Sequence, residues 1–575
     1  MVELTGTQAS ATVGIEQVDA IVVGSGISGG WAAKELAEKG LKVLMLERGK
    51  PLTHGRDYVG EHQPQWQRPN MGMRPRELYD QEYEVQSTSY AFDETTRHFW
   101  NNDQENPYDF DPDEPFHWMR ADVVGGRSLL WARQSYRWSD LDFEANKLDG
   151  AGIDWPIRYR DIAPWYAHVE RFIGVSGEKL GLSHLPDGEF QKPMQMNVVE
   201  DYVAKKIAQR FPGRVMTIGR TATLTEPLPG RAACHYCGPC HRGCTPGSYF
   251  SSLSSTLPAA QATGNFSLRA NALVESLEYD PVAKRVRAVR VVDTQTGERS
   301  RIAARVVFLC ASTVGSTQIL LNSPGANGGR SFANESDALG RYMMDHTYQA
   351  GARGIIPGFE EYYPYGYRPN GIYIPRFRNV QGDDEVGFTR GYGYQGGAQR
   401  IGWHELVSRT PGFGVEFKNS LRTPGPWRMS LGGFGEILPY AHNTMRLHKR
   451  KTDRFGIPQV TFHFEFGENE RRHREDLVEQ AALMLEAAGA TDIQRYSWPM
   501  IGGAAIHEMG TARMGHDPRE AVLNAHNQAH AAANLFVTDG ACMTSSSCVN
   551  PSLTYMALTA RAADYAVTQL QAGAI

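Results

Sequence analysis

The chain has 575 residues, of which 41% are hydrophobic and 21% charged, a balance typical of a globular protein with about two to four domains. Its formal net charge of −5 argues against a nucleic-acid partner. No apolar run approaches the roughly 20 residues that a membrane-spanning helix needs. Residues 1–17 are polar and lack a basic stretch followed by an apolar one, so we expect no secretory signal there. The sequence is compatible with the cytoplasm, or with the periplasm if a partner carries the signal.

The first predicted elements form a β-α-β unit, with strands over 18–23 and 42–46 and a helix over 31–39 between them. The turn after the first strand has the G-x-G-x-x-G spacing of dinucleotide-binding proteins, carried by Gly24, Gly26 and Gly29. Glu47 lies about 20 residues further on, where a carboxylate binds ribose hydroxyls, and Arg48 follows it. The unit therefore predicts a dinucleotide site. The acidic Glu47 disfavours NADP, but the motif alone does not separate FAD from NAD.

Four of the seven cysteines cluster in a predicted insertion over 230–248, at positions Cys234, Cys237, Cys240 and Cys244. Their spacing is that of bacterial ferredoxins, whose thiolates hold an iron–sulfur cluster. In two-cluster ferredoxins the fourth cysteine of such a run serves the other cluster, so this run supplies three clear local ligands. Closely spaced cysteines also bind zinc, and disulfides or free thiols are further alternatives. The sequence leaves these interpretations open.

The region over 351–504 has the pattern of a second domain. Two segments with alternating apolar residues, 444–449 and 459–466, predict strands of an antiparallel sheet. An amphipathic helix is predicted over 470–488, closed by Gly489. Earlier in the region lies a dense aromatic stretch of Phe359, Tyr362, Tyr363, Tyr365, Tyr367 and Tyr373. Such rings either stack on a carbohydrate or pack in a hydrophobic loop, and the sequence favours neither.

Two features near the C-terminus carry the candidate chemistry, His507 in H-E-M-G-T-A-R-M-G and Asn550 in N-P-S-L-T. A neutral imidazole, with an ordinary pKa of about 6.5, is suited to accept a hydroxyl proton near neutral pH. Loss of that proton makes it easier to remove hydride from the same carbon. A neutral amide can orient the hydroxyl oxygen without competing for the proton. Since Pro551 precedes a helical stretch over 553–566, Asn550 also fits a helix cap.

These motifs together resemble the glucose-methanol-choline (GMC) family of flavin oxidoreductases over nearly the whole chain. The N-terminal fingerprint matches, V-G-G-R-S-L-L-W at 124–131 resembles the flavin-contacting segment, and 308–323 resembles the second family signature. The C-terminal V-T-D-G and N-P-S-L-T-Y-M segments are the most specific match. The resemblance implies that His507 is the general base and that Asn550 holds the same hydroxyl oxygen. It also implies cofactor contacts from Gly125, Gly126, Ser128, Asp539, Gly540, Asn550 and Pro551.

The same resemblance implies an α/β FAD-binding Rossmann-like domain and an α+β substrate domain with an antiparallel sheet, similar to p-hydroxybenzoate hydroxylase. We expect the FAD-binding domain to combine 15–50, 225–350 and 505–575. The substrate domain is expected at 351–504. Residues 51–224 are expected to cover the flavin and to contribute the flavin-contacting segment.

The implied reaction is oxidation of an alcohol CH–OH group, on a sugar or glycoside ring, by hydride transfer to FAD. Some family members attach FAD through a histidine at the place of Leu130, so we expect non-covalent FAD here. Bacterial members with a similar cysteine insertion carry an iron–sulfur cluster, which implies a small partner subunit and a cytochrome acceptor. The alternatives are an oxygen-using sugar oxidase without a cluster, an NAD-linked dehydrogenase, and a non-catalytic subunit.

Overall fold

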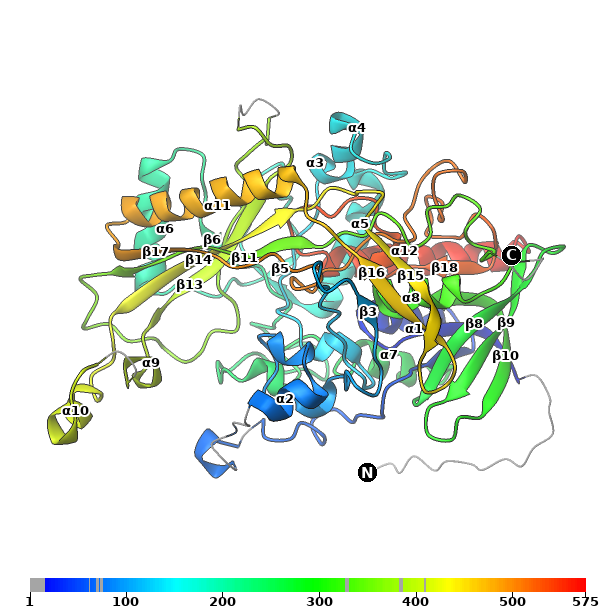
Figure 1. The fold of residues 1–575 in the computed structure, drawn as a ribbon, viewed down its shortest axis with the longest axis horizontal. Helices are drawn as coiled ribbons and strands as arrows, with labels where there is room; N and C mark the ends of the chain where they lie inside the picture. The colour runs from blue at the N-terminus through cyan, green and yellow to red at the C-terminus, as the bar shows by residue number, and fades with distance from the viewer. Residues whose placement is uncertain are drawn as a thin grey trace.

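A computed structural model of the chain describes residues 16–61, 63–68, 72, 76–325, 330–381, 386–407 and 410–575 (Figure 1). The expectation of no secretory signal falls on residues 1–17, and its first 15 residues lie outside the described ranges. Two large sheets lie at opposite ends of the molecule, with the antiparallel one at the left of the view. Among the described helices, none combines the length and the apolar character that crossing a bilayer requires.

The first large sheet has seven strands and draws them from distant parts of the chain. Its parallel core runs β7-β2-β1-β10, with β18 also parallel to β10, and the antiparallel strands β9 and β8 extend it. Strands buried on both faces are expected to be continuously apolar, as β2 is. The strands are β1 (Glu16–Val23), β2 (Val43–Leu46), β7 (Phe266–Arg269), β8 (Ala272–Asp280), β9 (Arg285–Asp293), β10 (Arg299–Leu309) and β18 (Leu535–Val537).

Four helices lie beside this sheet (Figure 1): α1 (Ile27–Glu38), α7 (Thr256–Ala262), α8 (Ser312–Leu321) and α12 (Ser552–Gln571). Helix α1 follows β1 directly and packs against α12 and α7, so the first and last helices of the chain are neighbours. This packing brings the N-terminal dinucleotide turn and the C-terminal segment together.

The second large sheet has six strands in the order β17-β11-β14-β13-β12-β6, with every neighbouring pair antiparallel. Helices α11 (Glu468–Ala487) and α6 (Val198–Arg210) pack on it, and a Cβ at Gly433 would lie only 2.2 Å from the Leu477 side chain of α11. Glycines in the strands therefore let the helix approach closely. The strands are β6 (Thr217–Ile218), β11 (His346–Ile356), β12 (Ile372–Ile374), β13 (Tyr392–Arg400), β14 (Trp427–Glu436) and β17 (Thr491–Ser497).

A parallel-core α/β sheet and a separate antiparallel sheet with helices confirm the predicted fold class. The segments 444–449 and 459–466 do form an antiparallel pair, β15 (Thr444–Thr452) and β16 (Pro458–His463). This pair does not join the six-stranded sheet, because it pairs with β3 (Asp109–Phe110). The six-stranded sheet also takes β6 and the start of β11 from outside 351–504, and the domain division stays a prediction.

The remaining elements are mostly short, and the majority of them lie within residues 51–224. The helices are α2 (Arg76–Glu82), α3 (Asp140–Phe143), α4 (Ala145–Asp149), α5 (Tyr159–Ile173), α9 (Trp403–Val407) and α10 (Gly414–Ser420), and the strands are β4 (Val175–Ser176) and β5 (Phe190–Gln191). Single 3-10 turns are η1 (Gln65–Gln67), η3 (Gln86–Thr88), η4 (Arg97–Phe99), η5 (Gly126–Leu129), η6 (Cys240–Arg242) and η7 (Gly540–Cys542).

Candidate active site

A cavity of about 320 Å³ takes its lining from both large sheets. From the first sheet it receives the dinucleotide turn, the end of β2 and the residues that follow β10 and β18. From the second sheet it receives Tyr348, Gln395 and Phe434. A single cavity thus runs from the predicted cofactor turn to the predicted catalytic residues.

The dinucleotide turn has the backbone that its glycines predict. Gly24 has a φ of +94°, and a Cβ there would lie 2.5 Å from the carbonyl oxygen of Cys310. A Cβ at Gly29 would lie 1.9 Å from the carbonyl oxygen of Gly24. At Gly26, which lines the cavity, a Cβ would meet no atom within 4 Å. The first and third glycines therefore close the turn, while the second leaves open space where a pyrophosphate could approach.

Glu47 and Arg48 both line the cavity at the end of β2. The Glu47 carboxylate accepts hydrogen bonds from the backbone N–H of Ser25 at 2.9 Å and of Gly49 at 2.7 Å. Burial raises the pKa of Glu47. The Arg48 guanidinium lies 3.2 Å from Oδ1 of Asp122. Glu47 already ties the turn to the strand, and its contact with a ribose stays a prediction.

The glycine-rich segment lies directly against the dinucleotide turn. A Cβ at Gly126 would lie 3.5 Å from Cα of Gly26. Gly125, with a φ of +97°, donates its N–H to Oγ of Ser25 at 2.8 Å. Ser128 donates its hydroxyl to the Gly125 carbonyl at 2.5 Å. The two motifs, about a hundred positions apart, therefore form one wall of the cavity.

The C-terminal motif supplies a second wall, where Asp539 and Gly540 follow β18 and line the cavity. The hydroxyl of Ser316 donates to Oδ2 of Asp539 at 2.5 Å, and burial raises the pKa of this carboxyl to about 6. Three predicted cofactor residues do not line the cavity themselves, and these are Gly29, Gly125 and Pro551.

His507 and Asn550 converge in this cavity as the sequence predicts. The Nδ2 atom of Asn550 lies 3.4 Å from Nε2 of His507. Burial lowers the pKa of His507 well below its ordinary value, and the nearby His346 and the positively charged Arg127 lower it further. The imidazole is therefore neutral near pH 7. Asp345 holds its backbone by accepting the His507 N–H at 3.0 Å.

The alternative role of Asn550 as a helix cap is wrong. Helix α12 begins at Ser552, Pro551 occupies the cap position, and no side chain caps the helix. The Asn550 side chain instead accepts a hydrogen bond at Oδ1 from Nε2 of Gln395 at 2.7 Å. The amide is thus free to face the cavity.

Several residues that shape this part of the cavity were not predicted from the sequence. His346 lies with its Nδ1 atom 2.8 Å from Nδ1 of His507. The ring centroid of Phe434 is 6.0 Å from that of His507, and Tyr348 lies 5.1 Å from Phe434. These residues belong to β11 and β14 and carry no motif. The only sequence signal would have been polar and aromatic residues in otherwise buried strands.

The aromatic stretch does not line the large cavity, so these rings would not stack on a carbohydrate bound there. Tyr365 is 94% exposed, and the Tyr367 N–H donates to the Tyr236 carbonyl at 2.9 Å, beside the cysteine segment. Only its two ends pack: Phe359 is half-buried against the core of the antiparallel sheet, and Tyr373 is buried and stacked on Tyr136, whereas the four tyrosines between them are exposed.

All four clustered cysteines carry free thiols, and Cys237 is exposed. A tetrahedral zinc ion needs sulfurs about 3.8 Å apart at Zn–S distances of about 2.3 Å. In the described part of the chain no three cysteine sulfurs lie within 4.8 Å of one another. Burial raises the pKa of Cys234 to about 11, and repulsion from the other three thiolates adds to this. The thiols are therefore neighbours without forming a compact zinc site.

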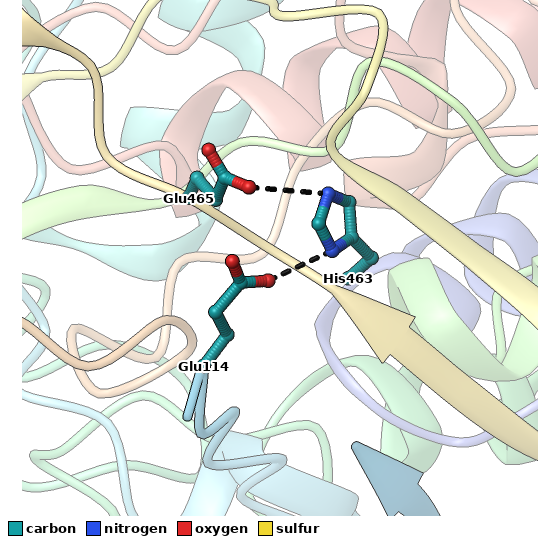
Figure 2. Close-up of side chains that lie close together, drawn as sticks. All are labelled: Glu114, His463 and Glu465. Carbon is teal, nitrogen blue, oxygen red and sulfur yellow. Dashed lines mark ion pairs between the residues drawn. The ribbon is translucent and has the colours of Figure 1, made fainter. Parts of the chain in front are cut away.

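Glu114, His463 and Glu465 form the one group of potential ligand atoms within 4.8 Å of one another among the described residues (Figure 2). Nδ1 of His463 lies 2.7 Å from Glu114, and Nε2 lies 3.4 Å from Glu465. Because each ring nitrogen faces its own carboxylate, ion pairing accounts for the group without a metal. It links the end of β16 to the segment that follows β3 and lies outside the cavity.

The chain is similar in sequence to a family of known proteins. Residues 18–348 and 439–559 match two GMC oxidoreductase family profiles. The chain belongs to the GMC oxidoreductase family. It is 28% identical to the 2-methyl-1,2-propanediol dehydrogenase of Mycolicibacterium austroafricanum over 96% of each chain. It is 26% identical to the fructose dehydrogenase large subunit of Gluconobacter japonicus, over 96% of this chain and 98% of the relative.

The fold comparison agrees with this assignment. The solved structure of pyridoxine 4-oxidase from Mesorbium loti superposes with a TM-score of 0.56 at 17% identity, covering 95% of this chain and 99% of that one. The predicted family and fold class are therefore confirmed, and this GMC chain is an oxidoreductase. Proteins of the family bind FAD, and the relatives named above include dehydrogenases of alcohols and sugars.

Proposed function

We propose that this GMC chain binds FAD non-covalently in the large cavity and oxidises a CH–OH group of a sugar or glycoside, with His507 as the general base. The observation that carries the proposal is the 3.4 Å approach of Asn550 to His507 inside a cavity that begins at the dinucleotide turn. FAD supplies the hydride acceptor when bound. The residues of this chain supply binding, orientation and proton transfer.

The cofactor-binding residues support FAD by position and chemistry. Open space at Gly26 and the N-terminus of α1 suit the pyrophosphate, since unpaired N–H groups there favour negative charge. Glu47 lies in the cavity where a ribose would bind. Leu130, which also lines the cavity, offers no nucleophile for covalent attachment. At the position where some family members attach FAD through a histidine, this chain therefore has an apolar side chain.

The catalytic step assigned to the chain is proton transfer. A substrate hydroxyl between the two side chains would donate its proton to Nε2 of His507 and accept a hydrogen bond from Nδ2 of Asn550. The low pKa of His507 keeps the base available near neutral pH. A base of this kind contributes about 10²- to 10⁴-fold to turnover.

The proposal of a sugar substrate is based on the relatives of this chain and on the polar lining of the cavity. Fructose dehydrogenase and 6'''-hydroxyparomomycin C oxidase are among the curated relatives. Gln395 and Tyr348 offer polar groups beside His507, and Phe434 offers an apolar face. This combination suits a ring with hydroxyls on its edge and C–H groups on its face.

The cysteine segment is proposed to hold an iron–sulfur cluster that passes electrons to a protein acceptor. Four neighbouring thiols supply ligands of the type that would hold such a cluster. Cys240 and Cys244 border a small cavity beside Leu129, which ends the flavin-contacting turn η5. The exposed Cys237 and Tyr365 lie on the outer side, where a small partner subunit or a cytochrome could dock.

The test is a measurement on protein purified without air. Flavin released by heat, iron and acid-labile sulfide are quantified, and a panel of sugars, glycosides and simple alcohols is screened for anaerobic loss of visible flavin absorbance. We expect releasable FAD, reduction by a carbohydrate, and reoxidation by a cytochrome rather than by oxygen or NAD⁺. Reoxidation by oxygen without iron would favour the oxidase. NADH formation, or absence of flavin, would reject the proposal.

A further inference from the structure

We propose that His346 is a positioning residue that holds His507 in the tautomer whose Nε2 carries no hydrogen. The inference deepens the proposed function and rests on His507 being the base. Its starting point is the 2.8 Å contact between the Nδ1 atoms of the two rings, which stand nearly perpendicular at 77°. One of these nitrogens must donate and the other must accept.

The other edge of His346 decides which one donates. Its Nε2 atom lies 2.9 Å from the carbonyl oxygen of Ser547 and 3.3 Å from that of Ser546. A carbonyl oxygen only accepts, so Nε2 of His346 must carry the hydrogen. Burial lowers the pKa of His346 to about 4, so the ring is neutral and carries a single hydrogen. Its Nδ1 atom is therefore a bare acceptor.

The tautomer of His507 follows from this. With a bare acceptor at 2.8 Å, Nδ1 of His507 must carry its hydrogen and donate it to His346. A neutral His507 then has no hydrogen on Nε2, the atom that lies 3.4 Å from the amide of Asn550. The lone pair faces the cavity, where a substrate hydroxyl would give up its proton.

The opposite tautomer pair is excluded by the same carbonyl oxygens. If Nδ1 of His346 carried the hydrogen, its bare Nε2 would face two lone-pair-bearing oxygens inside the protein. A buried acceptor left without a donor costs about 1–3 kcal/mol. If both ring nitrogens of His346 were protonated instead, the ring would carry an unpaired positive charge in a buried site. The arrangement with hydrogens on Nε2 of His346 and Nδ1 of His507 gives both nitrogens of His346 a hydrogen-bond partner without either cost.

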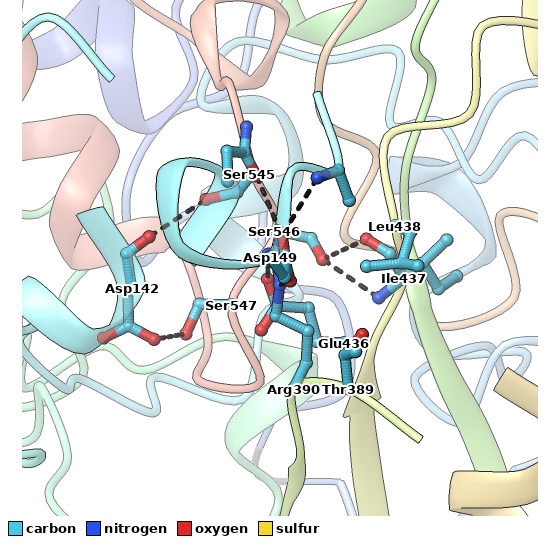
Figure 3. Close-up of polar contacts among 12 residues, drawn as sticks. Asp142, Asp149, Thr389, Arg390, Glu436, Ile437, Leu438, Ser545, Ser546 and Ser547 are labelled. Carbon is cyan, nitrogen blue, oxygen red and sulfur yellow. Dashed lines mark hydrogen bonds and ion pairs between the residues drawn. The ribbon is translucent and has the colours of Figure 1, made fainter. Parts of the chain in front are cut away.

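The accepting carbonyls are fixed by the turn that carries them (Figure 3). Ser547 donates its hydroxyl to Oδ1 of Asp142 at 2.6 Å, and its backbone has a φ of +55°. The hydroxyl of Ser546 donates to the Ile437 carbonyl at 3.0 Å and accepts the Ile437 N–H at 3.1 Å. Both serines are buried. The turn is thus held from α3 and from the end of β14, and its carbonyls cannot rotate away from His346.

The experiment compares three variants of the full-length holoenzyme. His346→Leu removes the acceptor, whereas His346→Asn keeps an acceptor where Nδ1 stands. Thr347→Val is the matched control, because Thr347 lies next along β11, is equally buried, and has its hydroxyl in a hydrogen bond with His473, at 2.9 Å. FAD content and Tm are measured for each, and the rate constant of anaerobic flavin reduction and the substrate Kd are separated by stopped-flow titration.

We expect His346→Leu to lower the rate constant by about 10- to 100-fold, as loss of an orienting partner does elsewhere, with little change in substrate Kd. His346→Asn should stay within about fivefold of the wild type, since one hydrogen bond is weakened but retained. Thr347→Val should keep the wild-type rate constant. A merely structural role of His346 would instead lower Tm and FAD content in both His346 variants and leave Thr347→Val unaffected.

Two results would overturn the inference. One is a wild-type rate constant in folded His346→Leu, and the other is an equal loss in His346→Asn and His346→Leu when Thr347→Val is normal. If His346→Leu fails to fold, the comparison of His346→Asn with Thr347→Val still decides, because a large loss confined to the former contradicts it. Failure of the proposed function looks different, since then His507→Ala itself would leave flavin reduction unchanged.

Discussion

Gln395 donates a hydrogen bond from Nε2 to the Oδ1 atom of Asn550 across 2.7 Å. Gln395 lies in β13 of the antiparallel sheet, while Asn550 precedes the last helix, so the contact joins the two halves of the molecule. Because Oδ1 of Asn550 is taken by this donor, its Nδ2 group must face His507 and the cavity. The antiparallel sheet thereby orients a group that belongs to the C-terminal motif.

The first prediction concerns this orientation. Replacing Gln395 with Leu removes the donor, and we expect kcat/KM to fall by about 2- to 10-fold, the loss that one hydrogen bond of about 0.5–1.5 kcal/mol gives. Replacing Gln395 with Glu should be worse, because a carboxylate would accept from Nδ2 of Asn550 and turn its oxygen toward the substrate. The control is FAD content, which should not change. An activity of Gln395→Glu equal to the wild type would contradict the argument.

The second prediction concerns the base. His507→Ala should lower the rate constant of flavin reduction by about 10²- to 10⁴-fold while FAD stays bound. The reason is that no other imidazole lies within hydrogen-bond reach of Asn550 among the described residues; His346 faces the far side of the His507 ring. Anaerobic stopped-flow measurement checks the rate, and a Tm near the wild type shows that the loss is chemical. Full activity in this variant would remove His507 from the mechanism.

The third prediction follows from the lowered pKa of His507. The active form of a base is the neutral one, which is present above the pKa of the folded enzyme and is lost as the pH falls through it. Burial, His346 and Arg127 all shift this pKa downward. We therefore expect kcat/KM to fall only on the acid side, at a pH well below the ordinary histidine pKa of about 6.5. A profile that declines already as the pH drops below 8 would show that another group limits the reaction.

The local motifs could be recognised from the sequence because their physics is local. The predicted strands over 18–23 and 42–46 correspond to β1 and β2, and the helix over 470–488 corresponds to α11. Glycine spacing, apolar runs and terminal glycines report on a few neighbouring residues, and these features needed no tertiary information.

Contacts between distant strands could not be recognised in that way. His346 and Gln395 contact His507 and Asn550 across 161 and 155 positions, and no spacing rule links them. The helix-cap interpretation of Asn550 was wrong because capping rules consider only neighbouring residues, whereas the side chain of Asn550 is held by Gln395 in the other sheet. The sequence could not place the exposed tyrosines near Tyr365 for a similar reason, since composition cannot tell which side of the molecule a loop faces.

The fourth prediction concerns the cysteine segment. None of its four cysteines lines the large cavity, so the reaction with substrate should not depend on them. Cys237→Ser, at the exposed member, should lower iron and sulfide per flavin and slow electron transfer to a cytochrome, without changing anaerobic flavin reduction by substrate. Metal analysis and the two half-reactions measured separately check this. Wild-type protein free of iron would remove the cluster from the mechanism and leave the oxidase as the better function.

The fifth prediction uses two glycines of one turn as each other's control. A Cβ at Gly26 meets no protein atom within 4 Å and points into the cavity, whereas a Cβ at Gly29 would lie 1.9 Å from the Gly24 carbonyl. Gly26→Ala should therefore fold normally and bind FAD less tightly, because the methyl group occupies space that the pyrophosphate needs. Gly29→Ala should unfold at lower temperature, because backbone must move to relieve the overlap. Tm of the flavin-free forms separates the two effects, and flavin titration measures the affinity. If Gly26→Ala binds FAD as tightly as the wild type, the pyrophosphate lies elsewhere in the cavity.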